Sequence, residues 1–207
     1  MPGTILDMHI HTTAGASDSG LSPEDLAAEA NKRGLTGINI TEHDRLWDTY
    51  KLNEYRERYF NGDKLAFMRT YFSHLAQAAE SGLFDCISHP DLIKNIFPRS
   101  WNFEVLMDDI CACLERIAKT GIAMELNTSG LQKAIREMNP GPAMLREMCL
   151  RKIPVVLGSD SHIPRRVGAD FESACGLLEA AGYAEVSYFI GRKRRTLALK
   201  AARESLR

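Results

Sequence analysis

Residues 5–11 read Ile-Leu-Asp-Met-His-Ile-His, so that apolar side chains at the even positions alternate with Asp7, His9 and His11. Alternation with a period of two is typical of a β-strand with one apolar and one polar face. His9 and His11 would leave such a strand on the same side, close enough for both imidazoles to reach one small cation. Because a buried polar row costs free energy unless its groups are satisfied, the stretch indicates a strand that carries a binding site.

The same combination of an apolar run and polar side chains recurs at four later places in the chain. We expect strands within 35–40, 84–89, 121–127 and 153–158, each ending in polar, potentially chelating residues. Helical patterns fill the intervals, at 22–34, 64–81, 103–120, 142–151 and 169–181. Alternating strands and helices predict an α/β fold, in which active sites lie at the carboxyl ends of the strands.

The length, charge and cysteine content of the chain limit the class of protein to which it can belong. The chain has 207 residues, a net charge of −1 and five cysteines without a Cys-x-x-Cys pair, which indicates reduced thiols and no general attraction to nucleic acid. A short strand is expected at 187–190, and the basic stretch 191–207 is interpreted as a solvated helical tail. No leader or membrane-spanning run is found. We expect one cytoplasmic domain over 1–207 with no nucleic-acid or membrane partner, and the oligomeric state stays open.

Five of the six histidines stand at or near predicted strand ends in acidic company. A single histidine there is most often structural, but five together favour metal binding, and imidazole with carboxylate suits zinc, manganese or iron. The sixth, His74, lies in the middle of a predicted helix, where a surface role is expected. The histidines are His9, His11, His43, His89 and His162, and their acidic neighbours are Asp7, Asp18, Asp44, Asp91 and Asp160.

These motifs, in their order along the chain, resemble the PHP (polymerase and histidinol phosphatase) superfamily. The strings are DMHIH, the loop Asp18, TEHD, SHPDLIK, ELNTSG and LGSDSH, and the longer FDCISHPDLIK, MELNTSGLQK and PVVLGSDSHIPRRVG resemble its histidinol-phosphatase branch. The resemblance covers nearly the whole chain. It implies a distorted TIM-like (β/α)7 barrel with up to three divalent metal ions at the carboxyl ends of its strands.

The resemblance also implies roles for individual residues. One metal would be held by His9, His11 and Asp160, another by His43, His162 and Asp18, and His89 would contribute to the remaining one. Asp160 and His162 are the implied catalytic residues, with either as proton donor. The second layer of the site would contain Asp7, Asp44, Glu125 and Asn127, and the basic residues that could bind the substrate's phosphate are Lys133, Arg165 and Arg166.

Two expected β-α units are missing between Asp44 and Phe84, together with the bridging glutamate and the histidine that they would carry. The intervening residues contain one clear helix and little strand pattern. Either a segment is missing from this sequence, with the join near Tyr59 to Asn61, or the protein has lost these strands and keeps an open site. A parallel barrel without them would expose two strand edges.

The expected function is hydrolysis of a phosphomonoester by metal-activated water, with L-histidinol phosphate as the first choice of substrate. Three alternatives stay open: another small phosphate ester, a module with a depleted site and no activity, and a nuclease-like or proofreading domain. The last fits poorly with a net charge of −1.

Overall fold

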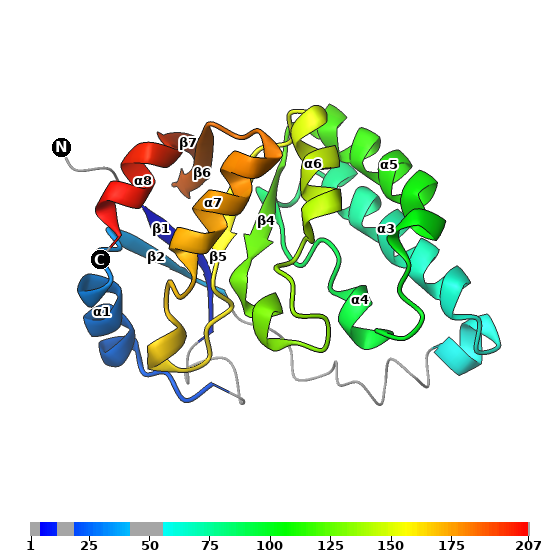
Figure 1. Cartoon of the computed structure of the whole chain (residues 1–207), viewed down its shortest axis with the longest axis horizontal. Coiled ribbons are helices and arrows are strands. Elements are labelled where there is room, and N and C mark those ends of the chain that lie inside the picture. The colour runs from blue at the N-terminus through cyan, green and yellow to red at the C-terminus, as the bar shows by residue number, and fades with distance from the viewer. Residues whose placement is uncertain (1–4, 12–18, 42–55, 207) are drawn as a thin grey trace.

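The computed structural model describes residues 5–11, 19–41 and 56–206 (Figure 1). Its first unit is β1 (Leu6–Ile10), α1 (Pro23–Lys32) and β2 (Gly37–Ile40), with β1 and β2 parallel. Ser22 caps α1, since its Oγ accepts from the Asp25 N–H at 3.1 Å. The opening stretch is therefore a strand, and its neighbour along the sheet is the strand predicted within 35–40.

The remaining strands form a second sheet in the order β3-β4-β5-β6-β7. Its first four strands are parallel, and β7 runs antiparallel to β6. The bounds are β3 (Cys86–Ile87), β4 (Ala123–Asn127), β5 (Val155–Gly158), β6 (Glu185–Ile190) and β7 (Lys193–Ala198).

Backbone contacts join β1 to the carboxyl end of β5. The Asp160 N–H donates to the carbonyl of His9 at 2.8 Å, and the His11 N–H donates to the carbonyl of Ser161 at 2.9 Å. The strands thus follow one another as β2, β1, β5, β4 and β3, which places the ends of β1, β4 and β5 together. Among the described residues, no strand pairs with the outer edges of β2 and β3, so the predicted barrel is not closed.

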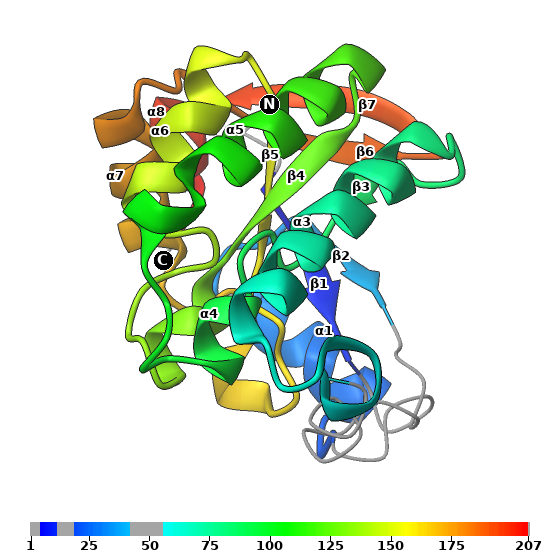
Figure 2. The same ribbon diagram turned by 90° about the vertical axis from the view of Figure 1, so that its right-hand side faces the viewer.

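Helices cover this arrangement from outside, and α3 and α5 lie side by side beyond β3 and β4 (Figure 2). Phe72, Leu106, Ile110 and Leu114 are fully buried between these helices and the sheet. Each such side chain stabilises the fold by about 1.5–3 kcal/mol. The helical bounds are α3 (Lys64–Glu80), α4 (Ile93–Ile96), α5 (Phe103–Thr120), α6 (Pro142–Leu150), α7 (Phe171–Ala181) and α8 (Leu199–Ser205), with 3₁₀ turns η1 (Thr128–Gln132) and η2 (Pro164–Arg166).

The closing basic stretch differs from the prediction of a helical tail. Residues 193–198 form β7, and only 199–205 are helical. The reason is the turn at Gly191 and Arg192, whose φ angles of 57° and 62° are those of a two-residue hairpin. The hairpin pairs β7 with β6, and this pairing outweighs the helix propensity of the basic residues. Their side chains are exposed, as expected of a solvated surface.

Candidate metal centre

Three potential ligand atoms meet where β1 approaches the end of β5. His9 Nε2 and His11 Nε2 lie 3.0 Å apart. Asp160 Oδ1 lies 3.5 Å from the first and 3.2 Å from the second. All three side chains are less than one-tenth exposed. The alternating pattern of β1 places His9 and His11 on the same side of the strand. The hydrogen bond from the Asp160 N–H to the His9 carbonyl brings the Asp160 carboxylate beside them.

The spacing of these atoms fits a bound divalent ion. Ligands at 2.0–2.1 Å from a tetrahedral zinc ion are about 3.3 Å from one another. The observed separations of 3.0, 3.5 and 3.2 Å are close to that value. Two imidazoles and one carboxylate also form a donor set typical of catalytic zinc, which keeps a fourth position open. The residues present therefore fit a metal ion.

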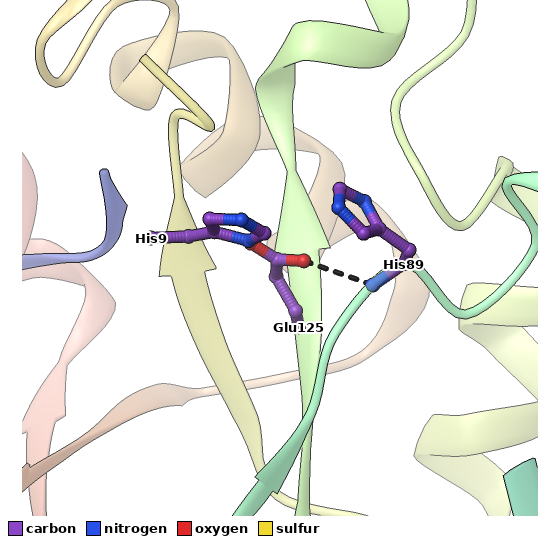
Figure 3. Close-up of side chains that lie close together, drawn as sticks. All are labelled: His9, His89 and Glu125. Atoms are coloured by element: carbon purple, nitrogen blue, oxygen red, sulfur yellow. Dashed lines mark hydrogen bonds and ion pairs between the residues drawn. The ribbon is translucent and has the colours of Figure 1, made fainter. Parts of the chain in front are cut away.

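Glu125 lies between His9 and His89 (Figure 3). Its Oε1 lies 2.7 Å from His9 Nδ1, and its Oε2 accepts from the His89 N–H at 3.0 Å. A carboxylate on Nδ1 keeps the hydrogen there and leaves the Nε2 lone pair for a metal. His9, His89 and Glu125 are themselves close enough to form a second potential ligand group. The hydrogen bonds of Glu125 favour an orienting role, which is the role that the sequence motifs imply.

Electrostatics in the centre are set by burial and by the carboxylates. Burial lowers the pKa of His9, but Glu125 and Asp160 outweigh burial and raise it to about 9. Burial lowers the pKa of His89 to about 4. Burial alone would raise the pKa of Asp160, but His11, His89, His9 and Lys133 hold it well below its usual range. Asp160 therefore stays ionised, as a metal ligand must.

Two of the predicted ligand residues have unusual backbone geometry. Asp160 and His89 have φ angles of 51° and 52°, in the left-handed region that side chains other than glycine rarely adopt. The backbone of His89 makes three contacts there: its N–H donates to Glu125, and its carbonyl accepts from the Tyr71 hydroxyl and from the Leu92 N–H at 3.3 Å. Strained residues at strand ends are typical of functional sites, where the surrounding structure fixes them.

Asp7 holds the backbone around the metal centre in place through hydrogen bonds. Its buried carboxylate accepts from the N–H groups of His9 at 3.2 Å, Ser159 at 2.9 Å and Gly168 at 2.8 Å. Burial raises its pKa to about 6, against the effect of these donors. Asp7 thus ties β1 to the β5 end and to the turn before α7, and the second-layer role predicted for it fits this position.

No family model matches the chain. It is 36% identical over 137 residues to a Deinococcus radiodurans protein named "Probable histidinol-phosphatase", with 65% of this chain and 49% of that protein covered. It is 33% identical over 91 residues to the histidinol-phosphatase of Bacillus subtilis, with 42% and 34% covered. The chain is therefore similar in sequence to proteins named histidinol-phosphatase. This confirms the resemblance predicted from its motifs, although the match spans only about half the length of the first relative.

Three further comparisons cover more of the chain. A "Probable phosphatase" of Syntrophotalea carbinolica is 27% identical, with 86% of this chain and 88% of that protein covered. The solved histidinol phosphate phosphatase of Lactococcus lactis, complexed with zinc, L-histidinol and phosphate, superposes with a TM-score of 0.73 at 18% identity, covering 93% and 99% of the two chains. A solved chain from Listeria monocytogenes gives 0.56 at 16% identity, covering 82% and 100%. These structures show that the fold is that of the histidinol phosphatases.

The structure separates the three predicted phosphate-binding residues. Lys133 lies at the centre, with Nζ 3.2 Å from Asp160 Oδ2. Arg166 is engaged elsewhere: Nη1 donates to Asp170 at 2.8 Å, and the guanidinium also meets the side-chain oxygen of Gln132 in the amide orientation that satisfies both groups. Arg165 is exposed, and its carbonyl accepts from Arg33. Lys133 is therefore the one of the three in contact with a predicted metal ligand.

The other predicted residues are distributed as follows. The His162 ring stacks on that of His11 with centroids 4.3 Å apart, and its Nδ1 lies 3.1 Å from the Asp160 carbonyl. Asn127 lies beside Glu125, with Nδ2 donating to Oε1 at 3.1 Å. His74 is exposed, as predicted. The predictions for Asp18, His43 and Asp44 fall outside the described residues.

Three supporting residues were not singled out from the sequence. Ser129 donates its hydroxyl to Asp160 Oδ2 at 2.9 Å, Tyr71 contacts the His89 carbonyl, and Gly158 lies against Glu125 and His9. Ser129 belongs to the NTSG motif and Gly158 to the GSDSH motif, so these motifs could have indicated that both residues lie at the site. Tyr71 comes from the face of α3, and nothing in its local sequence distinguishes it from a core aromatic residue.

Proposed function

We propose that this chain is a metal-dependent phosphomonoesterase that hydrolyses L-histidinol phosphate. The observation that carries the proposal is the convergence of His9 Nε2, His11 Nε2 and Asp160 Oδ1 at zinc-like spacing, within a fold shared with histidinol phosphatases. Relatives named for this activity support the same substrate class. The chain would act as a single metallophosphoesterase domain in the cytoplasm.

A divalent ion at this centre would supply Lewis-acid stabilisation of the phosphoryl oxygens and activate water at neutral pH. The chain's own residues would prepare the site. Glu125 fixes the tautomer of His9, and Asp7 holds the backbone of β1 in place. Lys133, whose side chain is 28% exposed, can meet a phosphate oxygen that enters from solvent.

His162 is the better candidate for the proton donor to the leaving alcohol. Asp160 is held ionised by its neighbours, and a carboxylate with a strongly lowered pKa is a poor acid. His162 is one-quarter exposed and lies beside the centre on the ring of His11. Zinc is the first choice of metal, with manganese and iron as alternatives. The alternative role for His162 is to hold a further ion together with Asp18 and His43, and in that case it would not be the proton donor.

The test is release of phosphate from L-histidinol phosphate by protein reconstituted with zinc, manganese or iron. We expect turnover with at least one metal and a loss of 10³-fold or more, on the order expected when metal catalysis is removed, in Asp160→Asn and His11→Asn. The exposed histidine variant His74→Asn is the matched control and should retain activity. Absence of turnover with all three metals would contradict the proposal for this substrate.

A second candidate function is hydrolysis of a different small phosphate ester. It is favoured by the phosphatase of Syntrophotalea carbinolica, which is matched over 88% of its length. A panel of sugar phosphates, nucleotides and phosphotyrosine distinguishes the two, because a preferred ester other than histidinol phosphate would show up as a higher kcat/KM. A module without activity is distinguished by elemental analysis, which would find no bound metal.

A further inference from the structure

A lysine with no part in the proposed reaction is fully buried beside the β3 loop, residues 88–92. Lys94 stands in the SHPDLIK motif at the start of α4, and its side chain is 0% exposed. Its three donors meet three acceptors: Asp91 Oδ2 at 2.9 Å, the Met138 carbonyl at 2.8 Å and Glu137 Oε2 at 3.4 Å. Because burial of an ion is costly, a group of this kind points to a specific role.

The pair formed by Lys94 and Asp91 joins two loops that come from different parts of the fold. Asp91 lies in the β3 loop, two residues after His89, and its Oδ2 also accepts from the Gly141 N–H at 2.8 Å. Gly141 ends the η1 loop, residues 133–141, which connects η1 to α6. The ion pair therefore fixes the position of one loop relative to the other.

Asn95, the next residue of α4, holds the η1 loop at two further points. Its Oδ1 accepts from the Ile135 N–H at 2.8 Å, and its Nδ2 donates to Asn139 Oδ1 at 3.3 Å. The first residue of the same loop is Lys133, whose Nζ lies 3.2 Å from Asp160 Oδ2. The contacts of α4 thus begin two residues after the lysine that reaches the metal centre.

The packing and hydrogen bonding of the ion pair favour a positioning role over a purely stabilising one. A Cβ at Gly141 would lie 3.3 Å from Lys94 Nζ and would collide with Glu137 Oε2, so the η1 loop lies tightly against the ammonium. Asp91 Oδ1 is buried and has no hydrogen-bond partner among the described residues. A buried ion pair with an incomplete set of hydrogen bonds gives no more stability than an apolar pair would.

We propose that Lys94 and Asn95 are positioning residues, which hold the β3 loop and the η1 loop in one arrangement. This arrangement brings His89 Nε2 to 4.0 Å and Lys133 Nζ to 3.2 Å from the same oxygen, Asp160 Oδ2. Side chains of a functional site need such support, because small displacements weaken binding. The link between the loops stands on the contacts of α4, and its effect on phosphate binding rests on the proposed function.

The test separates loss of stability from loss of positioning. Lys94→Met leaves the buried Asp91 carboxylate unpaired and should lower the thermal transition. The double variant Lys94→Met/Asp91→Asn removes both charges and keeps an acceptor for the Gly141 N–H, so its transition should return toward that of the wild type. We expect its dissociation constant for inorganic phosphate to stay about tenfold above that of the wild type, measured by calorimetric titration of the zinc-loaded protein. A purely structural ion pair would regain affinity together with stability.

Asn95→Ala is a second variant, which changes no charge. It removes the acceptor of the Ile135 N–H and should weaken phosphate binding in the same direction. The control is Arg69→Met/Asp109→Asn, which neutralises an exposed ion pair between α3 and α5 and should bind phosphate as the wild type does. Wild-type affinity in Asn95→Ala, or in the Lys94 double variant with a recovered thermal transition, would overturn the proposal.

Failure of the proposed function would show differently, because the wild type itself would then neither bind phosphate nor hydrolyse the ester. Hydrogen exchange decides the proposal in that case, since it needs no ligand. The Lys94→Met/Asp91→Asn variant should exchange faster than the wild type in both the β3 loop and the η1 loop. Unchanged exchange in either loop would overturn the link between them.

Discussion

At the residue scale, the centre depends on one buried carboxylate that connects ligands from two strands. Glu125 receives hydrogen bonds from His9, Asn127 and the backbone of His89, and it is fully buried. Burial raises its pKa, but His9 and His89 hold the pKa below its usual range, so it remains a carboxylate. Its neutral isostere would lose the charge that keeps hydrogen on His9 Nδ1.

Glu125→Gln should therefore weaken zinc binding by about 10- to 100-fold, the usual effect of losing a carboxylate that orients a metal-binding histidine. The dissociation constant can be measured by competition with a chromophoric chelator. Glu115→Gln, an exposed change on α5, is the matched control and should leave it unchanged. An unaltered zinc affinity in Glu125→Gln would show that the carboxylate does not orient His9.

Gly158 permits the close approach of Glu125 to β5. A Cβ at this position would lie 2.7 Å from His9 Cβ and would collide with Glu125 Oε1. We expect Gly158→Ala to destabilise the protein by about 1–3 kcal/mol, as overpacking does, and to weaken zinc binding as well. Gly176→Ala is the control, because nothing lies within 4 Å of a Cβ there and α7 should gain up to about 1 kcal/mol. Urea unfolding of both variants compares the effects, and equal stabilities would contradict the packing argument.

At the element scale, α3 fixes the loop after β3 through the Tyr71 hydroxyl, which contacts the carbonyl of His89. Burial raises the pKa of Tyr71 far above its usual value, so the group is a permanent donor. Tyr71→Phe should lower the free energy of unfolding by about 0.5–1.5 kcal/mol, because the His89 carbonyl loses one of its two donors and keeps the Leu92 N–H at 3.3 Å. Denaturant unfolding measures this loss. Unchanged stability would mean that the contact does not hold His89 in its strained conformation.

The buried faces of α5 and α7 contain thiols that should not react in the folded protein. Burial raises the pKa of Cys113 to about 12 and that of Cys175 to about 11, so neither forms thiolate at pH 8. Burial raises the pKa of Cys86 as well. We expect a thiol reagent to modify the partly exposed Cys111 and Cys149 before the buried Cys113 and Cys175, which should react only in urea. Rapid modification of all five in the native protein would contradict the packing of these helices.

The sequence predicted most elements because their patterns are local. Apolar spacing and capping residues placed α1, α3 and α5 within one or two residues of their observed ends. It failed at β7, since strand formation there depends on pairing with β6 across a turn. At the metal centre, the alternating pattern of β1 predicted His9 and His11, and the sequence motifs predicted Asp160 as the residue that joins them. The local sequence did not indicate that Lys133 would contact Asp160 or that Tyr71 would contact His89.

At the scale of the whole molecule, no described strand covers the outer edges of β2 and β3. Asn39 and Thr41 beside one edge and Cys86 and Ser88 beside the other line a cavity of about 330 Å³, which also reaches Glu125. Residues 56–85 contain no strand, so the two β-α units that the resemblance implies between Asp44 and Phe84 are not found there, and residues 42–55 are outside the described part. Within the described residues, no helix is long and apolar enough to cross a membrane.

The central claim is that β1 and the end of β5 hold a catalytic metal ion between His9, His11 and Asp160. The most direct measurement is anomalous diffraction at the zinc edge from crystals of the zinc-loaded protein. We expect a peak about 2.0–2.2 Å from His9 Nε2, His11 Nε2 and an oxygen of Asp160. A zinc-loaded crystal without a peak at this position, or with zinc bound only between His89 and Glu125, would contradict it.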